Sequence, residues 1–101
     1  MMASFQEIVK SNHLVLVEFW ADWCGPCKML APILEQVKNH MGDKIKVVTI
    51  DVEKNEKLVA QMMIAGVPTL MIFRNGEQVW KESGVLQSQD LIRIIEKELE
   101  K

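Results

Sequence analysis

The sequence predicts one α/β domain that spans residues 1–101. Two observations carry this prediction. Short apolar segments rich in β-branched residues alternate with longer segments whose apolar residues recur every three or four positions. The pair Asn75-Gly76, a strong hairpin signal, lies between the last two strand-like segments. Together they predict a mixed four-stranded sheet with helices on both faces.

Composition and charge narrow the class of protein. The chain is 49% hydrophobic and 26% charged, which is typical of a folded globular domain, and its net charge is −2. We therefore expect no nucleic-acid partner. No apolar run approaches the roughly 20 residues that cross a bilayer, so we expect no membrane span. The first residues lack a basic stretch followed by an apolar one, as a secretory signal would have, so we expect a cytoplasmic protein. We also expect a monomer.

The first half of the chain predicts two strands around a long helix. Residues 3–10 form a short opening helix, and residues 14–19 form a strand buried on both faces. A helical pattern then runs from the cysteines to Gly42, a candidate C-terminal stop. Pro32 lies inside this pattern and should kink the helix or restart it. Residues 45–52 form the second strand, which we expect to lie parallel to the first through a right-handed crossover.

The second half predicts a hairpin between two helices. A short helix covers residues 55–63, strands follow at 69–73 and 78–83, and residues 88–100 form an amphipathic helix. Ser88 is the candidate N-cap of this last helix.

Both cysteines of the chain lie in WADWCGPCK, residues 20–28. Cys24 falls where a strand ends and a helix begins, so unpaired helix N–H groups favour its thiolate and make it the attacking nucleophile. Cys27 lies one turn inward, is expected to be less exposed, and suits a resolving thiol. Gly25 and Pro26 let the loop approach a substrate closely and restrict the entry into the helix.

The sequence supports two other functions of the cysteine pair less well. A structural disulfide would close a very small loop in a chain without secretory features. A zinc site needs four ligands, and only His13 and His40 accompany the cysteines, without suitable spacing. A redox pair is favoured, and no metal site is expected.

The segment WCGPCK at 23–28, preceded by VEFWAD at 17–22, resembles the thioredoxin family. The resemblance extends to GVPT at 66–69, FRNG at 73–76 and SGV at 83–85. It implies the thioredoxin fold and a protein-disulfide reductase in which Cys24 attacks and Cys27 resolves. It also implies disulfide-containing protein substrates and recycling by a thioredoxin reductase, with no metal or organic cofactor besides the reversible Cys24–Cys27 disulfide. Two alternatives stay open: a binding module whose cysteines are incidental, and a disulfide oxidase or isomerase.

The family usually begins with an additional edge strand, for which the opening MMAS leaves no room. We therefore expect four strands in the spatial order 2-1-3-4, with residues 45–52 at an exposed edge.

We also expect a substrate-binding rim around the cysteines. Pro68 matches a proline that is cis in the family, and a cis bond would expose the backbone of Val67 to an extended substrate. Trp23 adjoins the nucleophile and should be partly exposed. The other expected rim residues are small or apolar: Ile64, Gly66, Gly84 and Val85.

Glu18 interrupts the doubly buried first strand, where a carboxylate is costly. One interpretation is that it reaches water at the strand end. The other is a buried carboxyl whose pKa is raised by desolvation. The family usually has aspartate here, which is thought to assist proton transfer at the resolving cysteine, and often a lysine where Thr49 stands. Without that cation, and unless Lys54 or another side chain reaches in, we expect a more strongly raised pKa for Glu18.

The chain has seven methionines and no tyrosine. We expect four of the methionines to fill gaps in the core: Met29, Met62, Met63 and Met71.

Overall fold

The computed structural model describes residues 4–101. Helix α1 (Phe5–Lys10) leads into strand β1 (Leu14–Trp20), and helix α2 (Gly25–Met41) is followed by a short 3-10 turn, η1 (Gly42–Lys44). Strand β2 (Lys46–Asp51), helix α3 (Glu56–Gln61), strands β3 (Thr69–Arg74) and β4 (Glu77–Ser83), and helix α4 (Ser88–Leu99) complete the order. All eight predicted helices and strands are present, with ends shifted by one or two residues.

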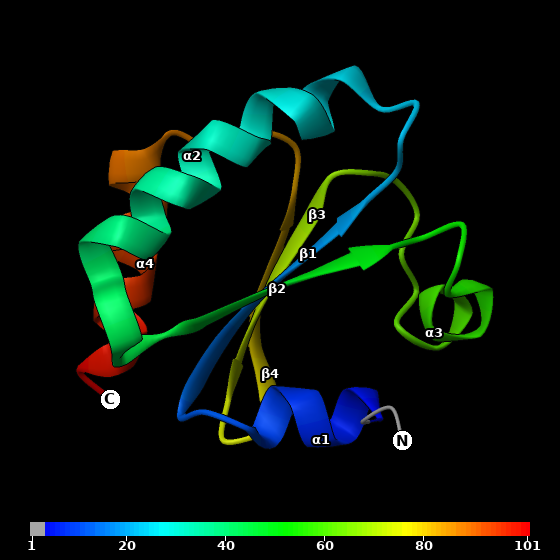
Figure 1. The fold of residues 1–101 in the computed structure, drawn as a ribbon. Helices are drawn as coiled ribbons and strands as arrows, with labels where there is room; N and C mark the ends of the chain where they lie inside the picture. The colour runs from blue at the N-terminus through cyan, green and yellow to red at the C-terminus, as the bar shows by residue number, and fades with distance from the viewer. Residues whose placement is uncertain (1–3) are drawn as a thin grey trace.

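The four strands form one sheet in the order β2-β1-β3-β4, as predicted. Strand β1 pairs in parallel with β2 and antiparallel with β3, and β3 pairs antiparallel with β4. Helices α2 and α4 cover one face of the sheet, while α1 and α3 cover the other (Figure 1). Strand β2 is at an edge, and within residues 4–101 no strand precedes β1.

The central position of β1 explains its composition. Residues 14–19 are all buried, and their side chains alternate between the two faces. Leu14 and Leu16 pack under α2 and α4, while Val15, Val17 and Phe19 pack toward α1 and α3. A strand covered on both faces needs a nearly continuous apolar run, which is the pattern that predicted it from the sequence.

The hairpin between β3 and β4 turns at the predicted pair. Asn75 and Gly76 both have positive φ, 52° and 89°, as a two-residue type I′ turn requires. Positive φ favours these two residue types, so the turn could be predicted from the sequence.

Two details of helix geometry differ from the expectation. Helix α2 continues through Pro32 as one element, so the alternative in which the helix restarts there is wrong, while a kink at Pro32 stays a prediction. Pro32 is exposed, and water can hydrate the carbonyl that loses its partner. The N-cap position of α4 is Gln87 rather than Ser88, because the amide of Leu91 already bonds the Gln87 carbonyl at 3.1 Å.

The methionine prediction holds for only part of the set. Met71 is buried and Met62 is half-buried. Met29, on the outer side of α2, is 65% exposed, and Met63, just after α3, is 78% exposed. These two side chains are therefore available to a partner instead of filling the core.

Within residues 4–101, no helix combines the length and apolar character that crossing a membrane requires.

Candidate functional site

Cys24 and Cys27 form a disulfide at the junction of β1 and α2, with their Cα atoms 5.3 Å apart. Cys24 is the N-cap residue of α2, and its Sγ accepts the backbone N–H of Cys27 at 3.1 Å. Pro26 occupies the second position of the helix, where its missing N–H costs nothing. The end of β1 thus places the Cys24 sulfur at the N-terminus of the 17-residue helix α2, which is the positive end of the helix dipole.

Exposure does not distinguish the two cysteines in this oxidised state. Cys24 is 3% exposed and Cys27 is 5% exposed, so the prediction that Cys27 is the less exposed was wrong. Both pack in a small apolar cluster with Ala21, against which Trp20 and Val67 lie. The asymmetry is electrostatic instead: only Cys24 lies before the helix and accepts an amide hydrogen bond from its first turn.

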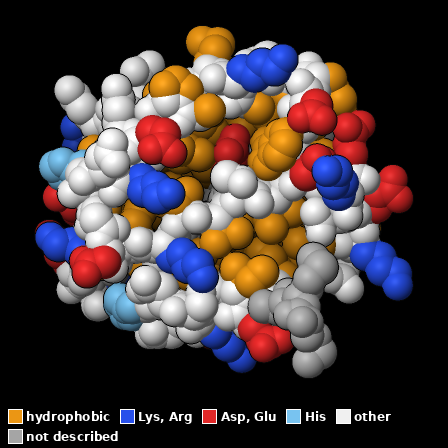
Figure 2. All heavy atoms as spheres, viewed as in Figure 1, with side chains coloured by type: hydrophobic (Ala, Val, Ile, Leu, Met, Phe, Trp, Pro, Cys, Tyr) orange, Lys and Arg blue, Asp and Glu red, His pale blue; other side chains and the backbone are white. Residues whose placement is uncertain are grey.

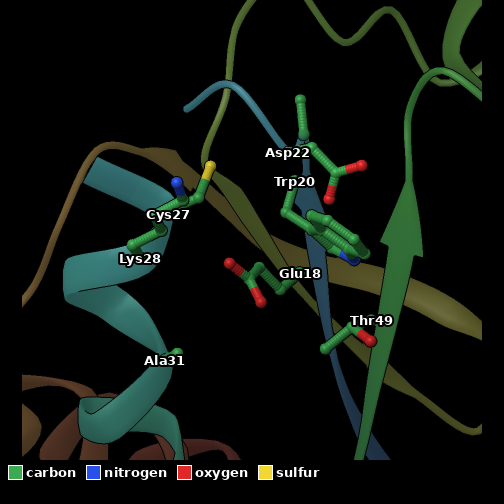
Figure 3. Close-up of a pocket in the computed structure, with 8 residues that line it drawn as sticks. Glu18, Trp20, Asp22, Cys27, Lys28, Ala31 and Thr49 are labelled. Atoms are coloured by element: carbon green, nitrogen blue, oxygen red, sulfur yellow. The ribbon is translucent and has the colours of Figure 1, made fainter. Parts of the chain in front are cut away.

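Glu18 lies on β1, paired with Thr49 on β2 and Leu70 on β3, and is 5% exposed. Its carboxyl group extends from the strand toward α2, on the side of Cys27 and Ala31 (Figure 3). This buried position contradicts the interpretation in which the side chain reaches freely into water. Burial raises the pKa of Glu18 from 4.5 to about 7.

The space in front of Glu18 is a hollow between α2 and the β1–β2 edge. One part, about 340 Å³, is lined by Trp20, Cys27 and Ala31, and an adjoining part of about 400 Å³ extends along α2. Figure 2 shows this hollow facing the viewer, with hydrophobic side chains around an acidic one. Glu18 and Thr49 line both parts and Cys27 lines the first, so the Glu18 carboxyl and Cys27 share one space.

No cation within residues 4–101 forms an ion pair with Glu18. Lys28 and Lys38 lie on the walls of the hollow, whereas Lys54 does not line it. The pKa of Glu18 is raised by burial, and the expectation that it is raised more strongly than in relatives with a lysine at position 49 stays a prediction.

A second, apolar groove of about 160 Å³ lies between Trp23 and residues 64–67. Trp23 forms one wall, is 68% exposed, and is held by a 3.1 Å hydrogen bond from its Nε1 to Glu53. The remaining lining residues come from the segment after β2 and from α3 and the segment that follows it: Val52, Val59, Ile64, Ala65, Gly66 and Val67.

The loop before β3 holds the predicted proline. The Val67–Pro68 peptide bond is cis, as expected. Thr69 Oγ1 donates to the Gly66 carbonyl at 2.6 Å, and the amide of Gly84 donates to the Pro68 carbonyl at 2.9 Å. Gly84 has a φ of 99°, which excludes most other residues there. Within residues 4–101 neither backbone group of Val67 has a backbone partner.

The structure brings four of the predicted rim residues together in one groove, whereas Gly25, Pro26, Pro68, Gly84 and Val85 do not line it. Trp23, Ile64, Gly66 and Val67 line the apolar groove. Val85 does not, because it packs against the core under α2 and α4. Sequence reasoning missed Val52 and Val59, which line the groove, and Glu53, which holds Trp23; none of them belongs to a motif, and only the fold brings them there.

Gly25 and Gly66 face open space. A Cβ atom added at either position would meet no atom of the protein within 4 Å. Neither glycine is therefore required by internal packing.

Within residues 4–101, no three side chains of the metal-ligating types gather in a way that could hold a metal ion.

Comparison with known proteins agrees with this geometry. The family model for thioredoxin matches residues 1–97. A thioredoxin of Bacillus subtilis is 42% identical over 89 residues, covering 88% of this chain and 86% of that protein. A thioredoxin of Rickettsia conorii is 39% identical over 100 residues, covering 98% and 95%. A mutant thioredoxin of Halobacterium salinarum superimposes with a TM-score of 0.86 at 36% identity, covering 96% of this chain and 84% of that one. Because the family model and these relatives cover most of the chain, and because Cys24 and Cys27 form a disulfide at the start of α2, the chain belongs to the thioredoxin family. It is a thiol–disulfide oxidoreductase that acts as a disulfide reductase.

Proposed function

We propose that Cys24 is the attacking and Cys27 the resolving thiol in the reduction of protein disulfides. The Cys24 thiolate attacks one sulfur of the substrate disulfide, forms a mixed disulfide, and expels the other substrate sulfur as a thiolate that takes up a proton. Cys27, as thiolate, then attacks the Cys24 sulfur and expels the second substrate thiolate. The substrate gains two electrons, and the Cys24–Cys27 disulfide seen here is restored.

One observation carries this assignment. Cys24 Sγ accepts the N–H of Cys27 in the first turn of α2, and that bond strengthens when the sulfur carries a negative charge. The same charge also lies at the positive end of the helix dipole. Cys27 lies within the first turn and lacks this arrangement, so its thiol waits until the mixed disulfide makes Cys24 an electrophile.

Glu18 is the proposed proton acceptor for Cys27. The Cys27 thiol must lose its proton before it attacks, and Glu18 lines the same hollow. With a pKa of about 7, its carboxyl is partly ionised at neutral pH and can take up a proton and release it again.

The apolar groove is the proposed docking site for the substrate. An extended segment would pair with the free backbone groups of Val67 and lie against Trp23. Gly25, Pro26 and Gly66 are exposed, which lets the segment come close to the disulfide. Gly84, bonded to Pro68, positions the cis loop from the side of β4, and Val85 anchors it in the core.

The proposed partners are protein disulfides and a thioredoxin reductase that returns the pair to the dithiol. The cycle requires a compartment that keeps thiols reduced, so the proposed location is the cytoplasm. The electrons pass through the protein's own cysteines, so the cycle uses no metal or organic cofactor. The proposed state is a monomer.

Insulin reduction tests the proposal. The wild-type protein, with a chemical dithiol to recycle it, should reduce the disulfides of insulin. Cys27→Ser should accumulate a mixed disulfide with insulin through Cys24, and Cys24→Ser should form none. A folded wild-type protein that leaves insulin intact would instead support a binding module, and trapping by Cys24→Ser would reverse the two roles.

A further inference from the structure

Helix α3 ends in a Schellman motif whose left-handed position is occupied by Met63. The amide of Ile64 bonds the Val59 carbonyl at 3.0 Å, and the amide of Met63 bonds the Ala60 carbonyl at 3.2 Å. These two bonds define the motif, and Met63, with a φ of 54°, is the residue that reverses the chain.

Methionine is an unfavourable residue at this position. Glycine is the usual choice because a Cβ atom is strained at positive φ. Elsewhere in residues 4–101 the chain follows this rule: its other positive-φ residues are one asparagine in the hairpin turn and three glycines. Met63 is the exception, so its side chain carries a stability cost that packing does not offset, since it is 78% exposed.

The same motif builds a wall of the apolar groove. Val59 and Ile64, the residues joined by the outer bond of the motif, both line the groove. Met63 lies between them in the chain and directly precedes the four lining residues 64–67. Its backbone is fixed, because its carbonyl also accepts Lys81 Nζ at 3.2 Å, while its thioether is free.

We propose that Met63 is a specificity-determining residue that contacts the substrate and favours disulfides flanked by a large apolar side chain. This inference rests on the proposed function of the groove. A flexible thioether adapts to apolar side chains of different shape, and together with the exposed Trp23 it enlarges the apolar surface at the rim. The stability that methionine costs at positive φ is then offset by the free energy of substrate binding.

Two disulfide peptides that differ at one position test the inference. Both have the same sequence, except that the residue next to the attacked cysteine is leucine in one and serine in the other. The measured quantity is the second-order rate constant for reduction of each peptide by the pre-reduced protein. The wild-type protein should prefer the leucine peptide, and its leucine-to-serine rate ratio is the reference.

Three variants isolate the side chain. Met63→Gly and Met63→Gln should each lower the leucine-to-serine ratio by roughly three- to tenfold, because about 40 Å² of apolar contact is lost. Met29→Gln is the matched control, since Met29 is also exposed but lies on α2 and is not adjacent in the chain to the lining residues 64–67, and it should leave the ratio within about twofold. Met63→Gly should also raise the Tm by roughly 2–6 °C, because glycine tolerates the positive φ.

The combination of a higher Tm with lost selectivity cannot come from misfolding. An unchanged ratio in both Met63 variants, with both peptides still reduced, would overturn the inference and leave the proposed function intact. A wild-type protein without preference for the leucine peptide would also overturn it. A wild-type protein that reduces neither peptide nor insulin would overturn both.

Discussion

Two glutamates are buried at opposite ends of the sheet, and their surroundings differ. Glu18 lies near the end of β1 and is 5% exposed, and Glu98 lies near the end of α4 and is 7% exposed. Glu98 is paired with Arg74, from the end of β3, and with Lys101 at 3.2 Å. Glu18 forms no ion pair within residues 4–101 and faces a hollow shared with Cys27.

The comparison shows that burial alone does not define the role of a carboxyl group. At Glu98 two cations balance the charge, and one of them, Arg74, joins the last helix to the sheet, which is a structural role. At Glu18 burial without a cation raises the pKa to about 7, which suits a group that exchanges protons near neutral pH. Variants at the two positions should therefore affect different properties of the protein.

The largest expected effect is on the pH dependence of stability. The folded protein holds the Glu18 proton more tightly than the unfolded chain does. Its contribution to the free energy of unfolding is therefore fully present below pH 4.5, declines as the pH rises to about 7, and is lost above that. The decline should amount to roughly 2–4 kcal/mol.

Urea unfolding of the oxidised protein between pH 4 and pH 8 measures this decline. Glu18→Gln should flatten the curve, so that it matches wild type at pH 4 and exceeds it at pH 8. An equal slope in wild type and Glu18→Gln would show that Glu18 does not titrate in this range.

The second effect is on the resolving step. Glu18→Gln should slow the release of substrate from the Cys24 mixed disulfide by roughly ten- to hundredfold at pH 7, because Cys27 loses its proton acceptor. Rapid-quench detection of the second substrate thiol measures this rate, and its pH profile in wild type should inflect near 7. Glu18→Asp should restore part of the rate, and Glu98→Gln should remain within about twofold of wild type. A wild-type rate in Glu18→Gln would remove Glu18 from the mechanism.

The third effect concerns the other glutamate. Glu98→Gln should lower the free energy of unfolding by about 1–2 kcal/mol, because Arg74 and Lys101 lose a charged partner but remain partly hydrated. Asp90→Asn is the matched control, since its pair with Arg93 on the same helix is exposed, and it should change stability by less than about 0.5 kcal/mol. Equal losses in the two variants would mean that the burial of Glu98 adds nothing.

The surroundings of Glu18 and the cysteines could be predicted from the sequence better than the surroundings of Glu98. The strands, the hairpin and the cysteine junction follow from apolar runs, turn residues and a motif, all of which are local signals, whereas the sheet order followed from the resemblance to the family. Glu18 was found because it breaks an apolar run. Glu98 lies in an amphipathic helix, where a glutamate is ordinary, and only the packing of α4 against β3 brings it to Arg74. Met63 was predicted to lie in the core, because no local sequence pattern shows which residues at the end of a short helix are covered by the rest of the protein.

The smallest effect comes from giving Glu18 the kind of partner that Glu98 has. Thr49 lies opposite Glu18 in the β1–β2 pairing and lines both parts of the same hollow. In Thr49→Lys, an ammonium near the carboxylate should lower the pKa of Glu18 by about one unit, because an opposite charge favours the ionised form. Carbon-detected NMR titration of the carboxyl group measures this shift, and Thr49→Gln, similar in length but uncharged, should not produce it. If both variants shift the pKa equally, then polarity in the hollow, rather than the missing cation, keeps the Glu18 pKa high.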